Sequence, residues 1–124
     1  MEIILLIILS HWFADFFLQS YNMSVNKSKS IYWLTIHINT YIYGLIPLMI
    51  YLLYFRMFTL DDVIIFLCLN YVFHWVTDFV TSKINTYLWN KKEVHWFFVS
   101  IGVDQVIHYL CLFLTYNYLT SQPI

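Results

Sequence analysis

The chain has 124 residues, of which 61% are hydrophobic and only 10% are charged, whereas about 25% of the residues in a soluble domain are charged. This composition argues against a soluble domain, and the net charge of −1 gives no electrostatic basis for binding nucleic acid. Two glycines and two prolines leave little material for turns. We therefore predict one all-α, integral membrane domain over residues 1–124, with long helices and short loops.

Four apolar segments follow one another along the chain. They predict helices over about residues 2–20, 32–55, 62–87 and 94–118. Each apolar segment has about 20 residues, which is the length that a hydrocarbon core of about 30 Å requires. We therefore predict a four-helix transmembrane bundle, in which the first helix is the shortest.

Each predicted helix carries ionisable side chains in its apolar segment, and most of them are spaced by four residues. Four residues make about one helical turn, so the members of a set share one face. An ionisable side chain within a membrane costs at least about 2.5–3.5 kcal/mol, so such residues indicate a function or a partner. The sets are His11, Asp15 and Gln19 in the first helix, His37 in the second, Asn70, His74 and Asp78 in the third, and Ser100, Asp104 and His108 in the fourth.

A short pattern occurs twice. The motif H-W-x-x-D-F begins at His11 and again at His74. This suggests two hairpin repeats, related by an axis along the membrane normal. His37 has no counterpart at the same offset from His74, so the second halves of the hairpins match poorly.

The basic residues predict the orientation of the chain. Loop one joins the first and second predicted helices, and loop three joins the third and fourth. These two loops lie at the same end of the predicted bundle, and the only basic residue at the other end is Arg56. By the positive-inside rule, loops one and three are cytoplasmic and both termini are outside. The lysines on the predicted cytoplasmic side are Lys27, Lys29, Lys83, Lys91 and Lys92.

The seven His and Asp residues of these sets all fall in the half of the membrane nearer to loops one and three, which predicts one polar centre. Neutral imidazole and carboxylate are ligands of zinc and other divalent ions of the first transition row. We therefore predict a centre with one or two divalent ions, zinc first and manganese or iron as alternatives. Its predicted ligands are His11, Asp15, His37, His74, Asp78, Asp104 and His108.

Two other interpretations remain open. The His and Asp side chains can form a hydrogen-bonded packing core of an interaction or exclusion factor, whose partner is a second copy of this chain or another membrane protein. They can also form a proton or ion pathway. A conductor needs polar positions through both halves of the membrane, whereas the outer halves of these segments are apolar.

Several blocks resemble a known family. The residues HWFADFFLQ from His11, HWVTDFVTSK from His74 and DQVIH from Asp104, together with Lys27 and His37, resemble the domain-of-unknown-function 3307 family. These are small membrane proteins of bacteria and their phages, and the resemblance covers nearly the whole chain. It implies a multi-pass protein of the bacterial inner membrane, but no activity.

The pattern is also similar, more loosely, to membrane-bound metal-dependent hydrolases of the bacterial DNA-damage response. We therefore predict a hydrolase that acts on a lipid-linked or membrane-proximal ester or phosphoester. One of Asp15, Asp78 and Asp104 would act as the general base, because the segments offer no conspicuous glutamate. The residues predicted to contact the substrate are Gln19, Lys27, Lys83 and Gln105.

Overall fold

The computed structural model describes residues 2–121, and every regular element in this range is helical. The predicted all-α class is therefore confirmed. The predicted ends of the domain, residues 1 and 124, lie outside the described range. The elements in chain order are α1 (Glu2–Trp12), the π-helical turn η1 (Phe13–Phe17), α2 (Tyr21–Asn26), α3 (Ile31–Tyr54), α4 (Leu60–Asn90) and α5 (Val94–Thr120).

Three of the described helices are long and apolar enough to cross a membrane. They are α3, α4 and α5, with 24, 31 and 27 residues. At about 1.5 Å per residue, each is longer than a hydrocarbon core of about 30 Å. The predicted first span is wrong, because α1 has only 11 residues. Residues 2–121 thus form five α-helices rather than the four predicted.

The first helix ends in a π-helical turn, which a capping serine follows. The N–H of Leu18 bonds to the carbonyl oxygen of Phe13 at 3.0 Å, which is the five-residue spacing of a π-helix. Ser20 then adopts an extended backbone and its hydroxyl accepts a hydrogen bond from the N–H of Met23 at 3.3 Å. Serine is a preferred N-cap, so the expected loop over 21–31 begins with the short helix α2.

Helix α4 starts with a side-chain cap, and both α3 and α4 end in a backbone motif. Thr59 and Asp62 form a reciprocal capping box at the start of α4, with bonds of 2.8 and 3.2 Å between backbone N–H groups and side-chain oxygens. Arg56 and Lys92, with φ of 54° and 60°, follow the ends of α3 and α4 in the left-handed region. There they allow the backbone bonds that close a Schellman motif.

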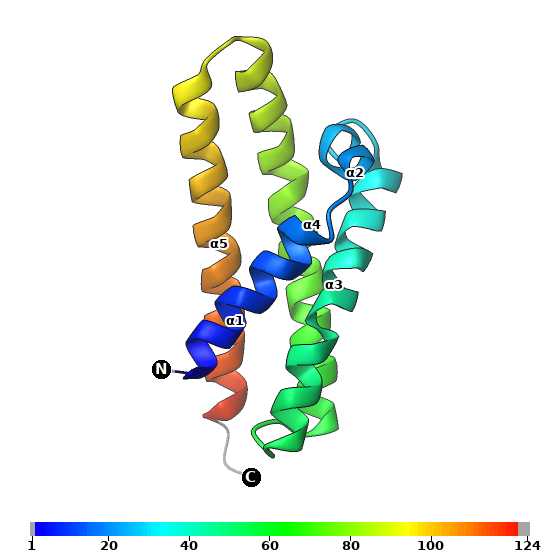
Figure 1. Ribbon diagram of the computed structural model, residues 1–124, viewed down its shortest axis with the longest axis vertical. Helices are drawn as coiled ribbons and strands as arrows, with labels where there is room; N and C mark the ends of the chain where they lie inside the picture. Colours follow the sequence, from blue (N-terminus) through cyan, green and yellow to red (C-terminus); the bar gives the residue numbers. More distant parts are fainter. Residues whose placement is uncertain (1, 122–124) are drawn as a thin grey trace.

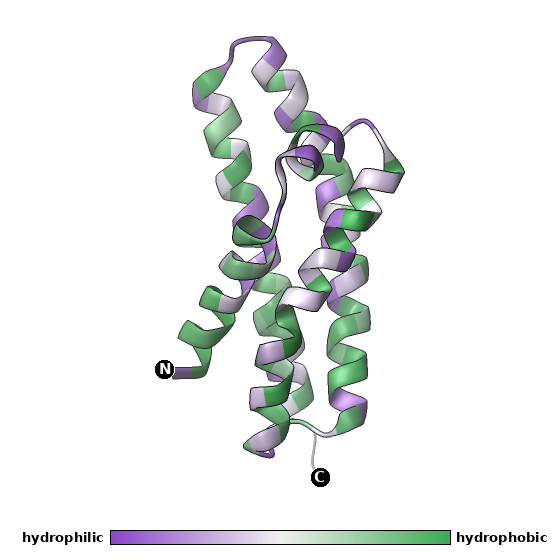
Figure 2. Ribbon diagram, turned by 45° about the vertical axis from the view of Figure 1, so that its right-hand side comes forward, coloured by the Kyte–Doolittle hydropathy of each residue, from purple (hydrophilic) through white to green (hydrophobic). Residues whose placement is uncertain are grey.

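The helices surround a common centre. Helix α4 packs against both α3 and α5, while α1 crosses obliquely over the molecule and packs on α3 and α5 (Figure 1). The α4–α5 loop marks one end of the molecule and the α3–α4 loop the other. Figure 2 shows hydrophilic residues at the α4–α5 loop, around α2 and at mid-height, whereas the end at the α3–α4 loop is mostly hydrophobic.

The buried core divides along the same axis. Toward the α3–α4 loop it is mostly apolar and includes Leu45, Leu52, Phe66 and Leu112. The buried His and Asp residues occupy the next layer toward the α4–α5 loop. The structure therefore confines the buried His and Asp residues to one level of the bundle.

A close helix contact holds η1 against α3. A Cβ atom on Gly44 would lie 2.6 Å from the Cβ and 2.8 Å from the Cα of Ala14. Only a residue without a side chain fits there, because real Cβ contacts are longer than 3.0 Å. Since Asp15 follows Ala14 directly, this contact fixes the position of the Asp15 carboxylate relative to α3.

Candidate metal centre

The structure brings together all seven His and Asp residues that the sequence singled out. They come from four elements: α1 with η1, α3, α4 and α5. None is more than 7% exposed. The cluster therefore lies inside the protein, and its members are His11, Asp15, His37, His74, Asp78, Asp104 and His108.

Four of these residues point ligand atoms at one place. The Nε2 atoms of His37 and His74 lie 3.4 Å apart, and the Oδ1 atom of Asp15 lies 3.1 Å from the first and 3.4 Å from the second. The oxygens of Asp78 lie 3.1 Å from His37 Nε2 and 3.7 Å from His74 Nε2. We call Asp15, His37, His74 and Asp78 the tetrad.

The spacing of the tetrad fits a metal ion. A tetrahedral ion with bonds of about 2.0–2.1 Å holds its ligand atoms about 3.3–3.4 Å from one another. The three distances among Asp15 Oδ1, His37 Nε2 and His74 Nε2, 3.1, 3.4 and 3.4 Å, lie within a few tenths of an ångström of this edge. Asp78 approaches the two imidazoles with different oxygens, Oδ2 toward His37 and Oδ1 toward His74. Two imidazole nitrogens and two carboxylates are also a donor set that zinc, manganese and iron accept.

A second group shares one member with the tetrad. His108 Nε2 lies 3.1 Å from Asp78 Oδ1 and 3.4 Å from Asp104 Oδ1. These three residues also offer ligand atoms close enough for one ion. Asp78 thus stands between two groups, and the rings of His74 and His108 stack with centroids 3.9 Å apart.

His11 and Gln105 support the carboxylates. The amide nitrogen of Gln105 donates to Asp15 Oδ2 at 3.2 Å and to Asp104 Oδ2 at 3.1 Å. These bonds fix the orientation of the amide, so its oxygen accepts from Nε2 of His11 at 2.9 Å. His11, a predicted ligand, belongs to neither ligand group of the described residues. Gln105, predicted to contact substrate, orients two carboxylates here.

Lys27 reaches the cluster from the end of α2. Its Nζ donates to Asp78 Oδ2 at 2.7 Å and lies 3.4 Å from His37 Nε2. Burial opposes the charge on Lys27, but the Asp78 and Asp15 carboxylates more than offset burial and raise its pKa. Three carboxylates and one ammonium leave two negative charges when the imidazoles are neutral. A divalent cation would balance that charge.

The remaining predicted contacts lie apart from the ligand groups. Gln19 lines a cavity of about 640 Å³ that adjoins the cluster. Lys83 is exposed, and its Nζ lies 3.4 Å from the centroid of the Phe79 ring. The roles of both residues in substrate binding stay predictions.

Three residues of the site were missed. Thr81 Oγ1 donates to Asp104 Oδ1 at 2.6 Å, and the ring of Tyr41 stacks on His74 with centroids 4.0 Å apart. Ser82 lies beside the cluster in the wall of the cavity. A signal for Ser82 was present, because it continues the steps of four through His74 and Asp78. Thr81 lies three residues after Asp78, which also places it near that face.

The fold and the cluster together define a helical protein with a buried His and Asp centre and three helices able to cross a membrane. A family model described as protein of unknown function (DUF3307) matches the chain. It matches residues 3–123, so the chain belongs to this family. No curated protein and no solved structure matches the chain. The family's description states no activity.

Proposed function

We propose that the chain is a metal-dependent membrane hydrolase, and that its substrate is a lipid-linked or membrane-proximal ester or phosphoester. The observation that carries this proposal is the convergence of ligand atoms from Asp15, His37, His74 and Asp78 at one place, close enough to hold one ion. Three apolar helices support a location in the bilayer.

The tetrad would hold a divalent ion, zinc first and manganese or iron as alternatives. Such an ion supplies Lewis-acid chemistry and activates water at neutral pH. The second group, with Asp104 and His108, offers a place for a second ion. Asp78 has one oxygen toward each group, which suits a carboxylate that links two ions.

With a single ion in the tetrad, Asp104 is free of metal and is the best placed general base. It lines the cavity, as Asp15 does, whereas Asp78 does not. Thr81 and Gln105 hold its two oxygens in place, and a base must be positioned within hydrogen-bond reach of the proton that it removes. Lys27 also lines the cavity, where its ammonium would contact an anionic substrate group.

One observation favours a second candidate function. Lys27 and Gln105 already give hydrogen bonds to all three carboxylates. A cluster whose three carboxylates are bonded in this way can serve as the packing core of a non-enzymatic membrane protein, although the Nδ1 atoms of His11, His37 and His74 have no hydrogen-bond partner in residues 2–121. Under that function the chain needs no metal, and loss of a cluster residue would disturb assembly.

Metal content separates the two functions. Wild-type protein, purified in detergent, is analysed by mass spectrometry for metals beside His74→Ala and Asp104→Ala. His95→Ala is the matched control, because His95 is exposed near the start of α5. The hydrolase proposal expects one or two equivalents of a transition metal in wild type and in His95→Ala. It expects loss of the tetrad ion in His74→Ala and loss of any second equivalent in Asp104→Ala.

The same preparation then decides on activity. Lipid phosphates and esters are offered to wild-type protein, to protein treated with a chelator, and to chelated protein with metal restored. Hydrolysis that is lost and regained would support the proposal. A wild type that holds no metal after divalent ions are added would overturn it in favour of the packing core.

A further inference from the structure

The cavity beside the cluster has two kinds of wall. Its lining residues run from Asp15 and Asp104 along α4 and α5 toward the α4–α5 loop. Its volume of about 640 Å³ lies within the range of about 300–1,000 Å³ that is common for small-molecule sites. At one end it is polar, and toward the loop it is lined by aromatic side chains, namely those of Trp89, Phe97 and Phe98.

Three polar atoms in this wall are buried without a hydrogen-bond partner in residues 2–121. They are Gln19 Oε1, Ser82 Oγ and Asn85 Oδ1. Ser82 as a whole is only 6% exposed. Buried polar groups are nearly always hydrogen-bonded, because an unsatisfied one is unfavourable. Three such atoms in one cavity indicate a ligand that brings its own hydrogen-bonding groups.

The chemistry of these three atoms limits the chemical class of ligand that the cavity can bind. A serine hydroxyl can donate and accept, and an amide offers both donors and acceptors. This combination suits hydroxyl groups on the ligand. The ammonium groups of Lys27 and Lys29 also line the cavity, and they suit a phosphate. The polar end is therefore matched to a headgroup with both hydroxyls and phosphate.

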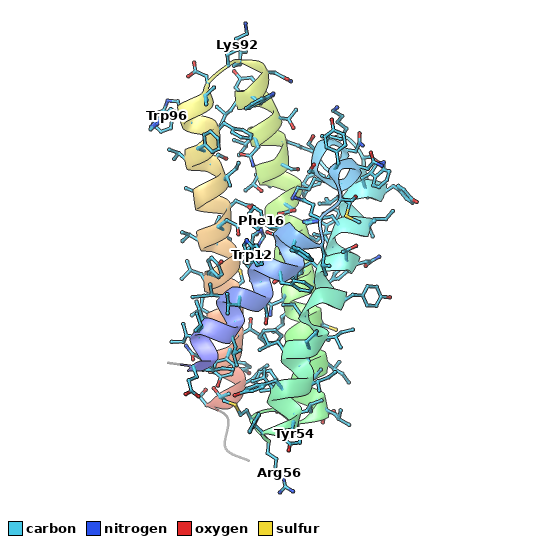
Figure 3. All side chains as sticks on the ribbon, viewed as in Figure 1. Trp12, Phe16, Tyr54, Arg56, Lys92 and Trp96 are labelled. Atoms are coloured by element: carbon cyan, nitrogen blue, oxygen red, sulfur yellow. The ribbon has the colours of Figure 1, made fainter. Side chains whose placement is uncertain are left out.

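The place of the cavity in the fold identifies the source of such a headgroup. It lies at the end of α4 and α5 that carries Lys91, Lys92 and Trp96, and Lys92 and Trp96 both stand at this end of the molecule in Figure 3. Tryptophan and lysine are enriched where a membrane helix meets the headgroup region. An amphiphile at this depth is a membrane lipid.

We propose that the cavity binds the headgroup of a phospholipid that carries hydroxyl groups, of the phosphatidylglycerol type. Ser82, Asn85 and Gln19 contact the hydroxyls, while Lys27 and Lys29 contact the phosphate. The aromatic side chains of Trp89, Phe97 and Phe98 line the part of the cavity nearer to the α4–α5 loop. As a substrate assignment this rests on the proposed function, but the binding itself needs neither metal nor activity.

Native mass spectrometry tests the binding. The detergent-solubilised protein is titrated with phosphatidylglycerol and, separately, with phosphatidylcholine of the same chains. The variants are Ser82→Ala and Asn85→Leu, which remove the unpaired atoms. Their matched controls are Ser121→Ala and Asn117→Leu, at exposed positions near the far end of α5. Glycerol 1-phosphate, added as a competitor, separates headgroup recognition from contact with the chains.

The expected result is a wild type that prefers phosphatidylglycerol, loses it to glycerol 1-phosphate, and binds it about tenfold more tightly than either variant. The controls should match wild type. Equal retention of both lipids by all proteins would overturn the proposal. If Asn85→Leu does not fold, Ser82→Ala decides alone, because it removes a single oxygen atom.

A parallel titration of His74→Ala separates this inference from the hydrolase. Retained lipid preference in His74→Ala would support the lipid site independently of the metal. A wild type that holds metal but shows no preference between the lipids would contradict the lipid site and leave the metal centre standing.

Discussion

Asp78 is the residue that connects most of the cluster. One of its oxygens lies 3.1 Å from His108 Nε2, and the other lies 3.1 Å from His37 Nε2 and 2.7 Å from Lys27 Nζ. Lys27 therefore competes with any ion for the same carboxylate oxygen. In a packing core the Lys27 ammonium is the partner of Asp78, whereas in a metal centre the ion is its partner.

Replacing Lys27 with methionine tests this competition. If the tetrad holds a metal, Lys27→Met should raise its affinity about tenfold, because a positive charge next to the ligands is removed. The affinity is measured by competition with a chromophoric chelator. Lys29→Met is the matched control, since Lys29 is exposed.

If the cluster is a packing core, the same variant should lower the stability of the protein and should not change metal binding. Removing one partner of a buried ion pair costs about 3–5 kcal/mol of stability. Lys27→Met would then melt at a lower temperature and show no gain in metal binding, whereas Lys29→Met would melt as wild type does.

Thr81 provides a test of how the carboxylates are positioned. Thr81→Val keeps the shape of the side chain but removes the hydrogen bond of 2.6 Å to Asp104 Oδ1. Residues that orient metal ligands commonly change metal affinity about 10–100-fold. We therefore expect a loss in this range, measured for the second equivalent of metal, since Asp104 belongs to the second group.

Thr77→Val is the control for this variant. Thr77 lies one turn earlier on α4, where its hydroxyl bonds only to the carbonyl oxygen of Phe73 in the described chain. It should bind metal as wild type does. Equal losses in both variants would show that threonine in this helix matters for stability and not for the position of Asp104.

The sequence predicted the membership of the cluster better than its internal contacts. Steps of four along apolar helices indicated that His74 and Asp78 share a face, and the similar depth of the sets indicated that they meet. The hydrogen bond between His11 and Gln105 depends on side-chain rotamers and on which donor each acceptor is paired with, and neither can be inferred from helical spacing. Lys27 reaches the centre from a loop through a long side chain, and helical periodicity says nothing about such a residue.

At the scale of elements, the long helices were predictable and the first was not. The apolar stretches and the caps place α3, α4 and α5 within a few residues of the predicted bounds. The π-helical turn that ends α1 depends on the tertiary contact between Ala14 and Gly44 and on the cap at Ser20. A scan for helical periodicity assumes an unbroken α-helix and so misses it.

The contact at Gly44 predicts the effect of a single methyl group. Gly44→Ala should push η1 away from α3, because the new Cβ would meet the backbone of Ala14 and not a flexible side chain. Overpacking of this kind costs about 1–3 kcal/mol. The melting temperature should fall, and metal should be lost as Asp15 moves away from His37.

The second glycine of the chain is the control for this prediction. A Cβ on Gly102 would meet nothing within 4 Å, and alanine favours a helix over glycine by about 1 kcal/mol. Gly102→Ala should therefore melt at the same or a higher temperature and keep its metal. A Gly44→Ala protein as stable as Gly102→Ala would show that α1 and η1 do not rest on α3 as closely as described.

At the scale of the whole molecule, the two ends differ in composition. The end at the α3–α4 loop is packed with apolar residues, and the level above it carries the cluster and the cavity. Because α1 is short and oblique, it covers the cluster from one side without spanning the molecule. The side of the membrane at which the cavity opens then decides which leaflet supplies its ligand.

The distribution of basic residues predicts that the cavity opens to the cytoplasmic side. Lysines lie at α2 and at the α4–α5 loop, whereas the only basic residue of the α3–α4 loop is Arg56.

The test replaces Cys68 and Cys111 with alanine and then places a single cysteine in one loop at a time, as Met57→Cys or Glu93→Cys. Neither change removes a basic residue, so the signal that orients the chain is kept. With a membrane-impermeant maleimide, Met57→Cys should be labelled in intact cells, and Glu93→Cys only after the cells are permeabilised. The reverse pattern would place the cavity, and with it the source of its lipid, in the outer leaflet.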